Sequence, residues 1–290
     1  MGTISKLDGV AIADIAKVDG IAIADISKII GQEAGSPFDP DAEAFFTAAG
    51  ITDATQKSAV DTLVLALKSA SIWTKMFAIY PFVGSTSTNH KYNLKDTTAY
   101  TLTFASGVTH SIAGMLINVG SAEYADTGFI PSSHWSSVSD ASTGIYQSLT
   151  TAQNFQNWGV ASAVGIIGWS NSGAGSLYPL INDTTYASVT SGSYADRIGF
   201  QQITRNTGGT SGKFLKLHNN VVTNPSFWSS GNTLSGSNIW IGRSNGGSRN
   251  GTSSNYFTFA YIGEGLSSTE LDDYYTAVQA FNTTLSREHT

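Results

Sequence analysis

The spacing of apolar residues changes three times along the chain, and the first pattern is a tandem repeat. An eleven-residue unit begins at Ile4, Ile15 and Ile26 and reads ISKLDGVAIAD, IAKVDGIAIAD and ISKIIGQEAGS. A repeat of this length would suit a right-handed helical coil. However, the glycine in every unit disfavours a helix, and the Asp-Gly pairs of the first two units favour tight hairpin turns. We therefore predict short strands joined by turns, in units too small to bury a face alone.

Residues 39–81 carry the spacing of amphipathic helices. Asp39 before Pro40 predicts the start of a first helix, and Gly50 predicts its end. Asp53 and Gln56 resemble a capping box for a second helix. The apolar stripe of that helix is Val60, Leu63, Val64 and Leu67. The same spacing recurs in Trp73, Met76, Phe77 and Tyr80, so helical structure is predicted up to Pro81.

From about residue 100 the apolar period becomes two, which predicts strands at 100–104, 214–217, 239–241 and 255–262. Turns rich in Gly, Ser and Asn lie at 171–175, 206–210 and 245–247. Many short strands separated by such turns indicate an antiparallel β-sandwich or barrel. A capping box at Ser267 and Glu270 then begins a C-terminal helix, which we expect to pack on the sandwich or on a neighbouring subunit.

These patterns divide the chain into four parts. Residues 1–34 form a repeat arm, 35–95 a small helical subdomain and linker, 96–266 a jelly-roll β-sandwich, and 267–290 the C-terminal helix. Each repeat must stack on its neighbours or on another chain. A homo-oligomer, with a trimer favoured, would let three arms share β-pairing.

Composition excludes several classes of function. A net charge of −6 and a pI near 5.2, with no cluster of Lys and Arg, argue against a nucleic-acid partner. Cysteine is absent, so disulfides and thiolate chemistry are excluded. No apolar run approaches the ~20 residues of a membrane span, and no secretory signal precedes the repeats. We expect no membrane insertion, and synthesis and assembly in a cytoplasm.

Two groups of segments resemble known families. Residues 239–245 (IWIGRSN) and 256–266 (YFTFAYIGEGL), followed by Ser-Ser-Thr-Glu, resemble the end of a concanavalin A-like jelly roll of the laminin-G/pentraxin type, and residues 118–128 resemble one of its strand-and-turn segments. Residues 48–53, 73–84 and 90–96 resemble a segment that precedes such jelly rolls in structural proteins of tailed bacteriophages. The repeats are similar to arms of phage virion proteins. The resemblance implies a virion component anchored by its arm.

The acidic residues give no pattern for catalysis. Glycosidases need two carboxylates across the sugar bond, and related jelly-roll hydrolases carry them as Glu-x-Asp-x-x-Glu, which is absent here. Glu123 and Asp126 are three residues apart, hence on opposite faces of a regular strand, and Asp196-Arg197 is interpreted as an exposed ion pair or turn. The five histidines are scattered, and no Gly-x-Ser-x-Gly elbow occurs. We predict no enzyme, no catalytic residue and no cofactor, although a Ser/His/Asp triad assembled in space stays open.

The jelly-roll resemblance also implies a rim that can hold calcium. Asp126, Asp183 and Asn220 are the weak candidates for ligands. No metal is predicted, because each of these residues more often caps a turn through its own backbone.

Sugar binding would use an aromatic face against the apolar side of a pyranose ring. Four tryptophans lie near predicted loops: Trp135, Trp158, Trp169 and Trp228. Such residues are more often part of a core than of a ligand platform. Trp240 stands between Ile239 and Ile241, and alternation alone does not decide whether it faces outward.

We therefore expect a non-enzymatic virion structural protein, either a capsid decoration protein or head fibre, or a tail or baseplate component. Its arm would bind other virion proteins through Lys6, Asp8, Gly9, Lys17, Asp19, Gly20 and Lys28. The alternatives are a lectin-like module for host-surface glycan, which is compatible with display on a particle, and a glycan-cleaving enzyme.

Overall fold

The computed structural model describes most of the globular body and part of the arm. The described residues are 6–7, 10–11, 17–18, 21–22, 37–118, 122–149, 158–160, 165–167, 176–183, 189–190, 198–206, 213–216, 222–223, 234–246 and 254–288.

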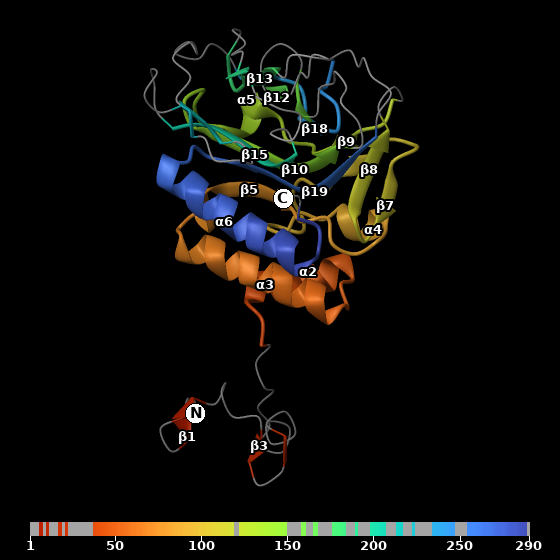
Figure 1. Cartoon of the computed structure of the whole chain (residues 1–290), viewed down its shortest axis with the longest axis vertical. Helices are drawn as coiled ribbons and strands as arrows, with labels where there is room; N and C mark the ends of the chain where they lie inside the picture. Colours follow the sequence, from red (N-terminus) through yellow and green to blue (C-terminus); the bar gives the residue numbers. More distant parts are fainter. Residues whose placement is uncertain are drawn as a thin grey trace.

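An antiparallel sheet of eight strands runs through the middle of the body (Figure 1). Its path is β17 (Val222–Thr223), β16 (Lys213–Lys216), β15 (Gly199–Arg205), β10 (Ala141–Leu149), β19 (Ser254–Gly263), β8 (Gly114–Asn118) and β7 (Thr109–Ser111). The eighth strand, β5 (Met76–Tyr80), also pairs with β19. β19 therefore has β10 along one side and β8 followed by β5 along the other.

One face of this sheet is covered by shorter strands. A four-stranded sheet has the order β11 (Trp158–Gly159), β18 (Trp240–Ile241), β9 (Ala125–Asp126) and β6 (Thr103–Phe104). A three-stranded sheet consists of β12 (Gly165–Ile167), β13 (Ser176–Leu180) and β14 (Val189–Thr190). The buried cluster on this side includes Phe257 of β19, Ile241 of β18 and Ala125 of β9. The predicted mainly-β, antiparallel sandwich is confirmed.

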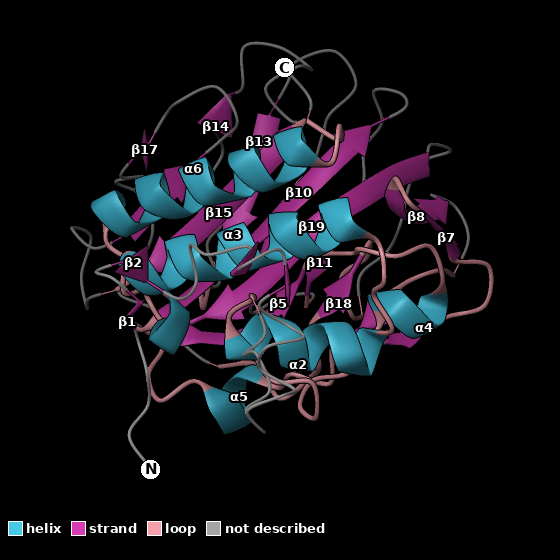
Figure 2. Cartoon of the chain, turned by 90° about the horizontal axis from the view of Figure 1, so that it is seen from below, coloured by secondary structure: helices cyan, strands magenta, loops and turns pink. Residues whose placement is uncertain are grey.

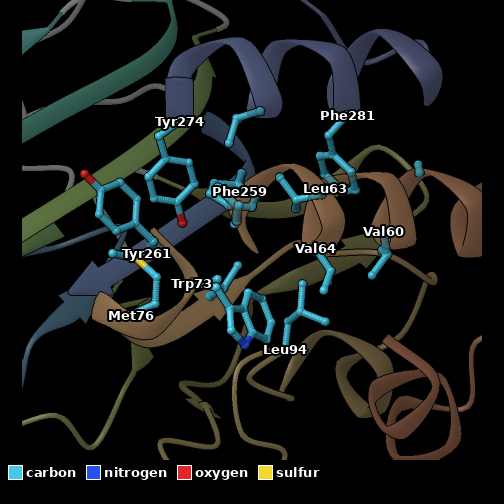
Figure 3. Close-up of a cluster of buried hydrophobic side chains, with 14 of the residues drawn as sticks. Val60, Leu63, Val64, Trp73, Met76, Leu94, Phe259, Tyr261, Tyr274 and Phe281 are labelled. Carbon is cyan, nitrogen blue, oxygen red and sulfur yellow. The ribbon is translucent and has the colours of Figure 1, made fainter. Parts of the chain in front are cut away.

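Long helices cover the other face of the eight-stranded sheet (Figure 2). They are α2 (Pro40–Ala49), α3 (Ala54–Ser69) and α6 (Ser268–Thr284). The short helices among the described residues are η2 (Trp73–Lys75), α4 (Ser87–His90) and α5 (Pro131–His134). Figure 3 shows the second buried cluster, where side chains of α3 and α6 meet Phe259 and Tyr261 of β19. The C-terminal helix thus packs on the sandwich of its own chain.

The helix boundaries follow the predicted capping residues. The Asp39 carboxylate accepts from the Asp41 amide, and Gly50 ends α2 in the left-handed region at φ 67°. Ser267 and Glu270 form the complete capping box of α6.

At α3 only half of the predicted capping box forms. Asp53 accepts from the Gln56 amide, but the Gln56 side chain accepts from the Gly84 amide at 2.7 Å. Gln56 therefore ties the start of α3 to the loop after β5.

The predicted helix at residues 73–81 is wrong. Only one 3-10 turn, η2, forms there, and β5 follows it in the central sheet. Met76 and Ile79 belong to the helix-side cluster, whereas Ala78 and Tyr80 belong to the cluster between the sheets. A strand buried on both faces has no polar side, so its apolar run cannot be distinguished from a helix by spacing. β5 thus belongs to the central sheet, although it precedes the predicted start of the sandwich at residue 96.

The first two repeats form the predicted hairpins. β1 (Lys6–Leu7) pairs with β2 (Val10–Ala11), and β3 (Lys17–Val18) pairs with β4 (Ile21–Ala22), in the same register. In Figure 1 both hairpins lie apart from the body. Lys6 and Lys17 each open a strand. The other arm residues named above, Asp8, Gly9, Asp19, Gly20 and Lys28, lie outside the described residues, as does the third unit.

A histidine pair links α4 to β7. The Nδ1 atoms of His90 and His110 lie 3.0 Å apart, so one ring must donate and the other accept. His90 is only 2% exposed, and its burial together with the nearby His110 lowers its pKa to about 3. Burial also lowers the pKa of His110. Both rings are therefore neutral in the folded protein at neutral pH.

The pair should make the fold sensitive to acid. In the unfolded chain His90 becomes protonated below about pH 6.5, whereas in the folded chain it stays neutral down to about pH 3. Stability should fall on acidification across this window, by up to about 1.4 kcal/mol per pH unit for one such group. Denaturant unfolding between about pH 7 and pH 4 measures the slope, and H90Q should flatten it. An unchanged slope in H90Q would contradict this assignment.

The chain leaves α6 through a Schellman turn. The Arg287 amide donates to the Asn282 carbonyl at 2.8 Å, and the Ser286 amide donates to the Thr283 carbonyl at 3.0 Å. Ser286 occupies the left-handed position of this turn, at φ 53°. Glycine is the usual residue there, because a Cβ makes this conformation unfavourable.

Substituting Ser286 with glycine should relieve this strain and stabilise the protein by about 0.5–1 kcal/mol. Thermal unfolding of S286G against wild type measures the effect, with Ser136→Gly, at an exposed position in the loop before β10, as the control. A lower midpoint for S286G than for the control would show that the serine is required in this turn.

Candidate binding face

The four-stranded sheet presents its outer face through the side chains that alternate with its core residues. Ile239 and Ile241 are both buried in the cluster between the sheets, so Trp240 faces the opposite way. In the register of the sheet Trp240 lies beside Asp126 of β9. Tyr124, two residues before Asp126, belongs to the same face.

Two aromatic rings stack on this face. The rings of Tyr124 and Trp240 are nearly parallel, with an interplanar angle of 7° and centroids 3.8 Å apart, and both residues are partly exposed. The Trp240 Nε1 atom is buried and has no hydrogen-bond partner among the described residues. The indole nitrogen is therefore covered, while other parts of the ring pair remain in contact with solvent.

Polar groups border the ring pair. Both oxygens of the Asp126 carboxylate accept from Asn238 Nδ2 at 3.1 Å, and Oδ1 also accepts from the Gly128 amide at 2.8 Å. Asn245 Nδ2 donates to the Asn238 carbonyl at 3.0 Å and so fixes the neighbouring loop. Because a carboxylate oxygen accepts two hydrogen bonds, Asp126 keeps acceptor capacity beside the rings.

Two of the four predicted glycan-binding tryptophans belong to the core. Trp135 is 3% exposed, and its Nε1 donates to the Gly263 carbonyl at 2.9 Å. Trp158 is fully buried between the sheets. Both predictions are corrected, because proximity to a loop in sequence does not place a large ring outside the sandwich. Trp169 and Trp228 lie outside the described residues.

Two of the three calcium candidates, Asp183 and Asp126, have other partners. Asp183 is fully buried, and its carboxylate pairs with Arg205 Nη2 at 2.9 Å, so a protein cation already neutralises it. Asp126 accepts from the Gly128 amide in its own turn, which is the role the sequence favoured, and Asn220 lies outside the described residues. Within the described part of the chain no three His, Cys, Asp or Glu residues gather closely enough to hold a metal ion.

Glu123 lies in a different environment from Asp126. It is almost buried, and its carboxylate accepts from the backbone amide of Asn118 at 2.7 Å and from its Nδ2 at 3.2 Å. Asn118 Oδ1 in turn accepts from Ser254 Oγ at 2.5 Å. Glu123 thus joins the end of β8 to the start of β19, whereas Asp126 borders the open face. The predicted Asp196-Arg197 pair lies outside the described residues.

Tyr124 and Asn238 are not among the site residues predicted from sequence. The available signal was the pair of isoleucines on either side of Trp240, which turns the indole outward if both face the core. The pairing of β18 with β9, which brings Asp126 and Tyr124 beside Trp240, joins segments far apart in the chain. No local pattern specifies such a pairing.

Comparisons with known proteins give distant similarities of structure. No protein-family model and no curated protein sequence matches the chain. The ligand-binding domain of botulinum neurotoxin serotype D, in complex with N-acetylneuraminic acid, matches with a TM-score of 0.43 and 12% identity over 71% of this chain and 52% of that one. A mutant Trypanosoma rangeli sialidase with trans-sialidase activity matches with a TM-score of 0.46 and 11% identity over 78% of this chain and 39% of that one.

A third match is a botulinum neurotoxin type C structure, whose description concerns cell entry through two ganglioside molecules. Its TM-score is 0.45, with 11% identity over 72% of this chain and 53% of that one. The chain thus spans about half of the toxin structures and less of the sialidase. Similarity at this level carries no argument about ligand or activity.

None of the described helices is long and apolar enough to cross a membrane.

Proposed function

We propose that the body is a non-enzymatic carbohydrate-binding module whose binding face is the Tyr124–Trp240 ring pair with its polar border. The observation that carries the proposal is the partly exposed stack of these two rings beside a carboxylate with free acceptor capacity.

The chemistry of this face suits a sugar. One side of a pyranose ring is apolar and packs against an aromatic side chain, while its hydroxyls need hydrogen-bond partners nearby. Asp126 can accept from a hydroxyl, and its own orientation is fixed by Asn238 and Gly128. Trp and Tyr also lose little conformational entropy on binding, because each has only two side-chain torsions.

The residues stand on strands rather than on loop tips. β18 and β9 are hydrogen-bonded neighbours, and the side chains that alternate with the site residues, Ile241 and Ala125, are buried in the core. A site built in this way holds its geometry before the ligand arrives, which lowers the cost of binding.

Replacing Trp240 with alanine should weaken sugar binding at least about tenfold, equivalent to about 1.4 kcal/mol. Glycan-array screening identifies the ligand, and calorimetric titration with that glycan gives the affinities of wild type, W240A and W240F. W240F should keep part of the affinity, because it retains a ring. W169A and W228A serve as controls that test the other tryptophans predicted from sequence.

Two results would contradict this proposal. One is a glycan that binds with equal affinity to wild type and W240A. The other is a properly folded wild-type protein that binds no glycan, in which case the rings only cover the sheet.

For the arm we propose attachment to a larger assembly, specifically a virion, with the body displayed outward. Each hairpin pairs only two residues per strand, and so small a unit is marginal by itself. Further repeats, or the arms of other copies in a trimer, would supply the missing partners. The resemblance of the repeats to arms of phage virion proteins supports the same location.

Deleting residues 1–31 should abolish incorporation into particles and leave the body folded, because both buried clusters begin after the arm. Copurification of the truncated chain with particles measures incorporation, and its thermal unfolding tests the body. A truncated chain that still incorporates normally would rule out anchoring through the arm.

A further inference from the structure

Strand β19 changes its neighbour on one side near Thr258. Its pairing with β8 ends where Phe257 meets Met115. Its pairing with β5 begins where Ala260 meets Tyr80. No described strand pairs with Thr258 or Phe259 on that side.

On the opposite side the register between β19 and β10 shifts at the same level. Phe257 faces Gln147, while Phe259 faces Tyr146. Thr258 is therefore the extra residue of a β-bulge, and bulges commonly redirect a side chain next to a functional site.

The hydroxyl of Thr258 has no partner in the part of the chain that the structure describes. The residue is 2% exposed, and its Oγ1 is buried without a hydrogen bond among the described residues. A buried hydroxyl in this condition costs about 1–3 kcal/mol of stability. The residue Thr258 lines a cavity of about 220 Å³ together with Ala113, Ser148, Tyr256, Ser286, Arg287 and Glu288.

Arg287, in the turn after α6, lines the same cavity. Its Nη1 donates to the Phe82 carbonyl at 2.9 Å and its Nη2 to the Pro81 carbonyl at 3.2 Å, just beyond the end of β5. The residue is 8% exposed, and its Nε has no partner in the part of the chain that the structure describes. Burial lowers the pKa of Arg287 to about 9, which leaves it charged at neutral pH.

No carboxylate among the described residues neutralises this guanidinium, since every ion pair there involves another cation. Glu288 also lines the cavity, but its carboxylate accepts from the Thr283 hydroxyl on α6. The guanidinium also lies over the ring of Phe281, 5.3 Å from its centroid. A buried cation held only by neutral groups is costly, and a bound anion would offset that cost.

We propose that this cavity binds a small hydroxylated molecule bearing a single carboxylate. The carboxylate would pair with Arg287, and hydroxyls of the ligand would bond to Thr258, Ser148 and Tyr256. The volume lies below the about 300–1,000 Å³ of drug-sized sites, which fits a ligand the size of one sugar acid. Glu288 at the same cavity disfavours ligands of higher negative charge.

The cavity has room to extend on one side. A second hollow of about 480 Å³ shares Ala113, Ser286 and Arg287 with it and reaches the start of α3 at Asp53. A neutral substituent on the ligand would lie there. This site is on the helix face of the central sheet and is independent of the proposed sugar face at Trp240.

The probe is D-glucuronate, with D-glucose as the neutral counterpart of the same size, both titrated at equal ionic strength by calorimetry. Glucuronate should saturate with a dissociation constant of the order of 1 mM or below, and glucose should bind at least about tenfold more weakly. T258V should weaken glucuronate binding about fivefold or more. Its thermal midpoint should be unchanged or higher, because no protein hydrogen bond is lost. T276V, on the exposed side of α6, is the matched control.

R287Q should abolish glucuronate binding, and W240A should leave it unchanged, which separates this site from the proposed sugar face. If R287Q does not fold, T258V decides the question, since its hydroxyl supports no other contact among the described residues. The proposal is overturned if glucuronate fails to saturate, if glucose binds equally well, or if T258V binds glucuronate as wild type does.

Discussion

Strand β19 supplies side chains to both buried clusters, and the rest of the body is arranged around this double burial. Phe257 and Ile262 enter the cluster between the sheets. Phe259 and Tyr261 meet the helices. A strand covered on both faces cannot alternate apolar with polar residues, which explains the nearly continuous apolar run across residues 256–262. Removing either covering layer would expose apolar side chains of the central sheet to water.

Double burial also constrains the polar groups at this level. Arg205 and Asp183 are buried together and pair with each other, so the fold keeps both charges by bringing them into contact. Arg287 is held differently, since it bonds to the carbonyls of Pro81 and Phe82. The two charges of an ion pair neutralise each other. A guanidinium bound to neutral carbonyls keeps its net positive charge and leaves a positive electrostatic potential in its cavity. That difference is what distinguishes a structural charge from a candidate ligand-binding charge in this molecule.

Local chemistry made part of the fold predictable. Asp39, Gly50 and the Ser267–Glu270 capping box mark helix ends through short-range hydrogen bonds, and the structure places these ends as expected. The strand at residues 255–262 is equally recognisable by its many aromatic residues, with the β-branched Thr258 and Ile262 among them. In the arm, an Asp-Gly pair predicts a tight hairpin, and the two described strand pairs have the same register in both units.

The wrong predictions share a different cause, because they depend on contacts between distant segments. The run from Met76 to Tyr80 becomes a strand only because β19 offers it an edge, and its spacing fits a helix equally well. Trp135 and Trp158 are buried by layers that their own sequence neighbourhoods do not contain.

The two candidate sites depend on the same kind of long-range information, but they differ in how much of it the sequence supplies. Trp240 could be assigned to the outer face once its isoleucine neighbours were known to be buried, so one tertiary fact completes the pattern. Predicting the cavity at Thr258 requires three tertiary facts. They are the bulge of β19 against β10, the change from β8 to β5 on the other side of β19, and the contact of the turn after α6 with the end of β5. A bulge adds one residue to a strand and requires no distinctive type of residue, so it is difficult to recognise in a single sequence. In the folded protein the bulge is marked by the Thr258 hydroxyl, which is buried without a hydrogen-bond partner among the described residues.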